Sequence, residues 1–144
     1  MLTQAEADRL IGLPKTIECP KNVKFPFFGD KREFDVAAAN KKDRFTVGVS
    51  RSRADLSKCT YQSIYKKDMI LARLDVGDGR HTNPNGESLA GAHLHIYREG
   101  FEDRWAFPLP KSFSDDMNLI TKFFEFLAYC NIENAGDVTL QEVI

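Results

Sequence analysis

An α+β fold is the class that this sequence predicts, with a mainly antiparallel sheet of about 5–7 strands, a short N-terminal helix and a longer C-terminal helix. Two observations carry the prediction. Alternation of apolar and polar residues, the period of a half-buried strand, recurs through the middle of the chain, whereas apolar residues at helical spacing are confined to its two ends. With 144 residues, 42% of them hydrophobic, the chain suffices for one core, so we expect a single domain over residues 1–144.

The two helices are marked by their boundary residues. Thr3 and Glu6 have the spacing of a capping box, and Pro14 ends the short amphipathic segment that follows. Ser114 is expected to cap the longer helix, because Asp residues follow it and apolar residues then continue at helical spacing as far as Ala128. We expect this helix to pack across the sheet.

The strands are predicted from segments with a period of two residues. The expected strands are 44–51, 59–65, 69–76 and 92–98, an edge strand within 104–110, and two shorter strands within 25–28 and 33–39. Gly, Asn and Pro dominate 78–91, which is therefore expected to be a loop that acts as a flap. We expect 92–98 to pair antiparallel with 69–76, burying Leu94 and Ile96.

Composition excludes several classes of protein. A formal net charge of -1 argues against binding a polyanion through bulk charge. The three cysteines form no C-x-x-C pair, so neither a disulfide framework nor a zinc knuckle is indicated. No apolar run is long enough for a signal peptide or a membrane span, and the expected location is cytoplasmic, with no membrane partner.

All three histidines lie in one region, at His81, His93 and His95. On a strand over 92–98, the alternation places His93, His95 and Tyr97 on the face opposite Leu94. If 69–76 is the neighbouring strand, its polar residues share that face. Such a face combines groups that transfer protons with groups that bind anions.

The sharpest functional interpretation is cleavage of an RNA phosphodiester without a metal ion or other cofactor. The reaction needs a base for the 2′-hydroxyl, an acid for the leaving oxygen and a cation on the phosphate. We expect His95 to be the base and His81 or His93 the acid, with Tyr97 beside them. The expected substrate-binding residues are Arg73, Arg98, Arg104 and Asp75.

Three other interpretations stay open. The polar face is compatible with an ordinary solvated sheet surface. His93, His95 and Glu99 have H-x-H-x-x-x-E spacing, which suits zinc, iron or manganese, and His81 could supply a further, upstream ligand in a non-standard version of that motif. A non-catalytic module that binds a protein partner, such as an antitoxin or an inhibitor, is the runner-up. Basic residues scattered from Lys41 to Lys67, including Lys58, are expected to be solvated or to line the path of an anionic ligand.

Three blocks of the chain resemble a family of uncharacterised bacterial proteins of this length. They are LTQAEADRLIGLPK, SKCTYQSIYKKDMILARLDVGDGRHTNPNG and HLHIYREGFEDRWAFPLP. The resemblance implies no activity. It implies a bacterial or mobile-element origin, a setting in which small toxins, phage-defence effectors and their inhibitors are common.

Overall fold

The computed structural model describes residues 1–140 and has the predicted α+β fold. In chain order its elements are α1 (Gln4–Gly12), β1 (Lys15–Ile17), a 3-10 turn (Pro20–Asn22), β2 (Lys31–Ala38), β3 (Arg44–Arg51), β4 (Cys59–Tyr65), β5 (Met69–Val76), β6 (Arg80–Thr82), β7 (Ser88–Ala90), β8 (His93–Ile96), β9 (Ala106–Pro108), α2 (Leu119–Tyr129) and a second 3-10 turn (Ala135–Asp137).

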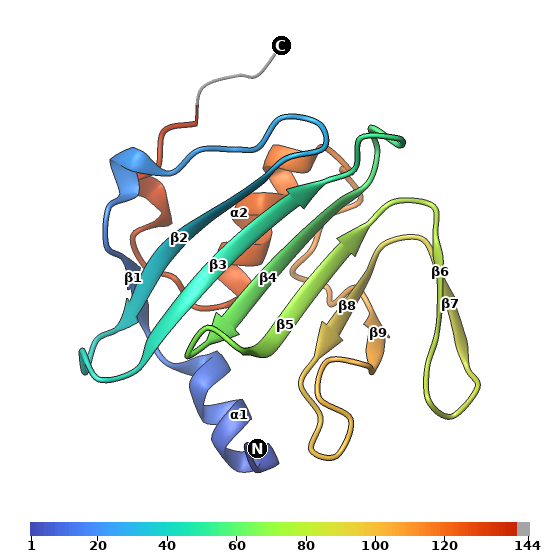
Figure 1. The fold of residues 1–144 in the computed structure, drawn as a ribbon, viewed down its shortest axis with the longest axis horizontal. Coiled ribbons are helices and arrows are strands. Elements are labelled where there is room, and N and C mark those ends of the chain that lie inside the picture. Colours follow the sequence, from blue (N-terminus) through green and yellow to red (C-terminus); the bar gives the residue numbers. More distant parts are fainter. Residues whose placement is uncertain (141–144) are drawn as a thin grey trace.

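Seven strands form one sheet in the order β1-β2-β3-β4-β5-β8-β9, and every neighbouring pair in it is antiparallel. Two further strands, β6 and β7, form a separate hairpin that leaves the sheet after β5 and returns to it at β8 (Figure 1). We call residues 77–91 the arm. Because the arm separates β5 from β8 in the sequence, their pairing is a long-range contact.

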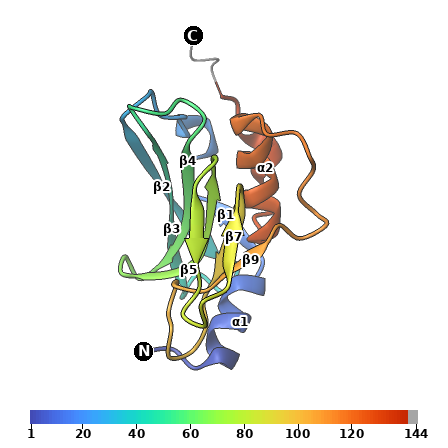
Figure 2. The ribbon, with the colours of Figure 1, turned by 90° about the vertical axis from the view of Figure 1, so that its right-hand side faces the viewer.

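The sheet and α2 form two layers (Figure 2). Aromatic residues fill the space between them: Phe123 and Phe126 of α2 are buried and pack against Tyr61 of β4. Leu74 and Leu94 belong to the same core and are 0% exposed. The alternating residues of these strands therefore project from the opposite face of the sheet, where the polar groups gather.

Several expected elements differ in the structure. Residues 25–28 form no strand. They lie in an irregular loop, in which Phe25 is buried and Phe27 and Phe28 are exposed. The strand β1 was not predicted, since three residues are too few for a recognisable period. The segment 78–91 is a short hairpin rather than a loop alone.

The second helix begins later than expected. Asn118 is its cap, and the side-chain oxygen accepts hydrogen bonds from the N–H groups of Ile120 and Thr121. Ser114 lies outside the helix, where its carbonyl oxygen accepts a 2.7 Å hydrogen bond from the buried Lys122 ammonium. The predicted Ser114 cap is therefore wrong, although a helix over this segment is confirmed.

A buried lysine joins both helices to the sheet. The Lys15 ammonium donates to the carbonyl oxygens of Ile11, Leu13 and Cys130, at 2.7, 3.0 and 2.8 Å. Ile11 and Leu13 lie at the end of the first helix and Cys130 at the end of the second, where carbonyl groups lack a hydrogen-bond donor within the helix. The Lys15 ammonium supplies this donor to both helix ends, and its positive charge is favourable there. Burial lowers the pKa of Lys15 to about 8, which leaves the ammonium protonated at neutral pH with all three of its N–H donors in use.

Replacing Lys15 by methionine tests this junction. Lys15→Met keeps most of the volume but leaves three carbonyl groups without their donor, and each such group costs roughly 1–3 kcal/mol when it is buried. We expect the free energy of unfolding to fall by about 3 kcal/mol or more in urea denaturation. Lys24→Met, at an exposed position, is the control and should change it by less than about 0.5 kcal/mol. Equal stability of the two variants would contradict the junction.

Candidate functional site

The pairing of β5 with β8 brings the polar residues of the two strands together. In this antiparallel register Asp75 lies opposite His93, and Arg73 lies opposite His95. The predicted pairing and the burial of Leu94 are confirmed, while Ile96 is half-buried. Two cross-strand pairs on the face opposite the core therefore define the candidate site.

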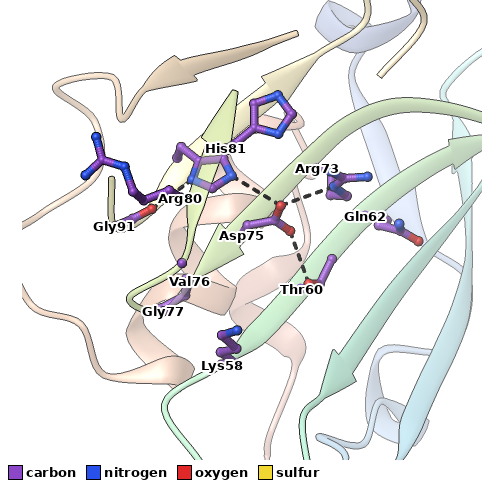
Figure 3. A pocket seen from close by; sticks show the side chains of 12 residues that line it. Lys58, Thr60, Gln62, Arg73, Asp75, Val76, Gly77, Arg80, His81 and Gly91 are labelled. Atoms are coloured by element: carbon purple, nitrogen blue, oxygen red, sulfur yellow. Dashed lines mark hydrogen bonds and ion pairs between the residues drawn. The ribbon is translucent and has the colours of Figure 1, made fainter. Parts of the chain in front are cut away.

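Asp75 is the centre of the site (Figure 3). Its Oδ2 lies 3.1 Å from Nε2 of His95, 3.3 Å from Nε2 of His93 and 3.4 Å from Nε of Arg73. Its Oδ1 accepts a 3.1 Å hydrogen bond from the Thr60 hydroxyl on β4. Burial alone would raise the pKa of Asp75, but the hydrogen bonds from the two imidazoles and the charge of Arg73 outweigh it and hold the pKa well below its usual range.

The same contact acts on His93. The hydrogen bond to Asp75 raises the pKa of His93 above its ordinary value, against the opposing effect of burial. Arg73 makes a second ion pair, because its Nη1 donates to Asp103 Oδ2 at 2.8 Å. The site thus pairs an arginine and a histidine with two carboxylates, all on or beside the β5–β8 pair.

Each imidazole also donates to a backbone carbonyl. His93 Nδ1 lies 2.8 Å from the Gly91 oxygen, and His95 Nδ1 lies 2.8 Å from the Asp103 oxygen. His81 Nε2 lies 2.9 Å from the Arg104 oxygen. A carbonyl oxygen only accepts, so each of these ring nitrogens carries the proton.

The arm is fastened over the histidines by Asn83. This side chain donates to the Ala106 oxygen at 2.9 Å and accepts from the Ala106 N–H at 2.8 Å, pairing with β9 as a neighbouring strand would. His81 of β6 is thereby held against the other two histidines, with ring centroids 5.6 Å from His93 and 4.5 Å from His95. The arm therefore contributes the third histidine of the site.

A cavity of about 410 Å³ opens beside the histidines, between β4, β5 and the arm (Figure 3). Its wall includes His81, His93 and Asp75, together with the cationic side chains of Lys58 and Arg80; the other residues that line it are Thr60, Gln62, Arg73, Val76, Gly77, Gly79 and Gly91. Within residues 1–140 neither the Lys58 ammonium nor the Arg80 guanidinium has a hydrogen-bonding or ion-pair partner, which leaves both charges available to an anion.

Gly77 determines where Lys58 lies. It adopts φ +141°, and a Cβ placed on it would meet Lys58 Cγ at 2.7 Å. Only glycine allows the lysine stem to cross the backbone this closely. The ammonium is thereby carried past the start of the arm and towards Gly79.

The three predicted catalytic histidines differ in whether they reach the cavity. His95 is 0% exposed and does not line the cavity, whereas His93 and His81 do. Tyr97 was expected on the same face but is buried in the core, where its hydroxyl donates to the Leu2 oxygen. That prediction is wrong because β8 ends at Ile96, beyond which alternation no longer assigns a face.

Two of the predicted arginines lie outside the cavity. The Arg98 guanidinium stacks on Trp105 at 4.0 Å, and the Arg104 guanidinium donates to the carbonyl groups of Phe101 and Gly100. Arg73 and Asp75, in contrast, are in the predicted place. Nothing in the sequence indicated a role for Arg80, Asn83 or Asp103. Lys58 was indicated only as one of the basic residues between Lys41 and Lys67 that could line the path of an anionic ligand.

The expected carboxylate for a metal ion is displaced as well. Glu99 accepts a 2.7 Å hydrogen bond from the Gln4 N–H at the start of α1, away from the other two members of its motif. His81 stands in its place: one ring nitrogen of each of His81, His93 and His95 lies within 4.8 Å of the others. The H-x-H-x-x-x-E interpretation is therefore wrong in its third residue.

Removing the Asn83 side chain tests the docking of the arm. Asn83→Ala leaves the N–H and C=O groups of Ala106 without partners, at about 1–3 kcal/mol each, so the arm should open more often. We expect backbone amides of residues 77–91 to exchange hydrogen at least about tenfold faster. Glu87→Ala, which shortens an exposed side chain of the same arm, should leave the rates unchanged. Unchanged exchange in Asn83→Ala would show that the arm is held by other contacts.

Comparisons with known proteins assign the chain to a family but indicate no activity. No curated protein and no solved structure gives a significant match. Within residues 1–140 the structure has no helix both long and apolar enough to cross a bilayer. The model of a family of unknown function, DUF6978, matches residues 2–132, which is most of the chain and confirms the resemblance to an uncharacterised family. The protein belongs to that family.

Proposed function

We propose that this protein binds and cleaves an RNA phosphodiester in the cavity beside the arm, by proton transfer and without a metal ion. The observation that carries the proposal is the position of His81. Its Nε2 is fixed by the Arg104 carbonyl, while its Nδ1 has no hydrogen-bond partner within residues 1–140, and the ring lines a cavity that also holds unpartnered cations.

The roles of the histidines follow from these contacts. The His81 N–H is taken up by the carbonyl, so the lone pair of Nδ1 is free to accept the 2′-hydroxyl proton. We assign the role of the acid to His93, because its contact with Asp75 favours the charged form of the ring. His95 is sealed from the cavity and positions Arg73, whose Nη2 lies 3.0 Å from His95 Nε2. Relative to the roles expected from the sequence, the base moves from His95 to His81.

The reaction is then a transfer within the substrate. The 2′-oxygen gives its proton to His81 and forms a bond to phosphorus, while the bond from phosphorus to the 5′-oxygen breaks. The 5′-oxygen takes a proton from His93, which leaves a 2′,3′-cyclic phosphate and a 5′-hydroxyl end. The charges of Lys58, Arg73 and Arg80 offset the negative charge that develops on the phosphate.

A second candidate function is a non-catalytic module that binds a protein partner. It is favoured by exposed apolar side chains on the loops before β2 and before β4: Phe27, Phe28 and Leu56 are 56%, 43% and 56% exposed. The two loops are neighbours, since a Cβ on Gly29 would lie 3.0 Å from Arg53 Cβ. Exposed apolar residues gathered in this way are typical of interaction surfaces.

Cleavage of a labelled RNA in EDTA tests the first candidate. We expect products that end in a 2′,3′-cyclic phosphate, and a rate about 100- to 10,000-fold lower for His81→Ala, the usual effect of removing a group that transfers a proton. Lys58→Ala should lower the rate by removing a phosphate cation. Arg32→Ala, which removes one positive charge on β2 outside the cavity, is the control and should cleave as the parent does.

Two results would contradict the proposed cleavage. Equal rates for the parent and His81→Ala would assign the products to a contaminating nuclease. Absence of cleavage by the parent, together with normal growth of cells that express it, would leave the binding module as the better account.

A further inference from the structure

The three histidines present an arrangement that proton transfer alone does not require. Every one of the three rings has one N–H fixed by a backbone carbonyl, from Gly91, Asp103 and Arg104. These bonds determine the tautomer of a neutral ring, whose second nitrogen can then bind a metal ion. In His93 and His95 that nitrogen lies against Asp75, so a metal ion would displace the proton that the ring shares with the carboxylate. Carbonyl groups that hold the far nitrogen in this way are the usual outer partners of histidines that bind metals.

One ring nitrogen of each of His81, His93 and His95 lies within 4.8 Å of the others. The nitrogens that are not bonded to a carbonyl oxygen are Nδ1 of His81 and Nε2 of both His93 and His95. The Asp75 Oδ2 atom lies 3.3 and 3.1 Å from the Nε2 atoms of His93 and His95. When all three rings are neutral, three lone pairs and a carboxylate around one point repel each other unless a positive charge lies among them.

In this structure Arg73 supplies a positive charge there. Its Nη2 lies 3.0 Å from His95 Nε2, and its Nε lies 3.4 Å from Asp75 Oδ2. The guanidinium has a second attachment, because Nη1 donates to Asp103 at 2.8 Å. Arg73 can therefore give up its contact with His95 and keep an ion pair, which makes room for another cation.

We propose that His81, His93 and His95 form a binding site for a zinc ion, with Asp75 beside it, and that zinc inhibits the protein. Three neutral imidazoles and one carboxylate are a ligand set that suits Zn²⁺. The inhibitory part rests on the proposed function, since zinc occupies the same Nδ1 lone pair of His81 that takes the substrate proton. Zinc binding and phosphodiester cleavage are then mutually exclusive.

Binding requires only a small closure. Zinc holds imidazole nitrogens at about 2.0–2.1 Å, so tetrahedral ligands lie about 3.3 Å apart. The nitrogens must approach by at most about 1.5 Å from their present separation. His81 is the ligand best able to move, because it belongs to the arm, whereas His93 and His95 lie on a strand of the main sheet.

Cobalt is the probe for the site, because Co²⁺ takes the same ligands as zinc and absorbs visible light when four-coordinate. We expect one Co²⁺ per chain in a spectroscopic titration, displaced by one equivalent of Zn²⁺. His81→Ala should weaken the affinity by at least about 100-fold, given that losing even an outer partner costs about 10–100-fold. Glu99→Ala, at the ligand position suggested by spacing alone, should bind as the parent does.

His93→Gln provides a second variant with a similar volume, in case one substitution impairs folding, and circular dichroism of each variant checks the fold. In the RNA assay, one equivalent of Zn²⁺ should abolish cleavage by the parent and EDTA should restore it.

The outcomes separate the two proposals. Absence of Co²⁺ binding, or equal binding by the parent and His81→Ala, would overturn the metal site whatever the RNA assay gives. Binding that is lost in His81→Ala supports the site even if no RNA is cleaved, in which case only the proposed function and the inhibition fail. Cleavage that increases with zinc would keep the site and overturn both the inhibition and the metal-free mechanism.

Discussion

The register between β5 and β8 is the constraint on which the candidate site depends. Asp75 meets His93 and Arg73 meets His95 because Leu74 and Leu94 face each other between those pairs, buried in the core. A slip of one residue would turn the apolar residues outwards and the charged residues inwards. Burial of two leucines thus sets the geometry of the polar groups on the opposite face.

The polar groups in turn form a balanced set. Asp75 and Asp103 carry negative charge, and Arg73 forms an ion pair with each of them. Removing a single member of a partly buried network leaves a charge without its partner, which is far more costly than never having formed the network. Such a network favours one arrangement of side chains. The arm adds to this order, since Asn83 pairs with β9 on the side from which His81 reaches the other histidines.

The sequence allowed the sheet and half of the site to be predicted, for a physical reason. A strand has a period of two residues, so the opposite orientations of Leu94 and His95 can be deduced without any other part of the molecule. The same reasoning fails at Tyr97 and Glu99, because the strand ends at Ile96 and nothing local in the sequence marks that end. A pattern extended past its element assigned both residues to the wrong place.

Residues brought in from a distance could not be predicted in this way. Asn83 looks like an ordinary turn residue, and its role depends on the Ala106 backbone lying beside it. Lys58 enters the cavity because its stem crosses Gly77, a contact between two loops that no periodicity reveals. Similarly, His81 replaces Glu99 beside the other histidines only because a three-residue strand pair folds back over the sheet.

The attachments of the first helix and strand bear on how the protein is made. Gln4 is held by Glu99, and Lys15 is held by the Cys130 carbonyl. A ribosome releases the earliest of these segments long before its partners, so apolar residues such as Leu10 stay uncovered while the rest is translated. Contacts this distant also form slowly. The first helix can therefore complete its packing only after residues around 130 have left the exit tunnel.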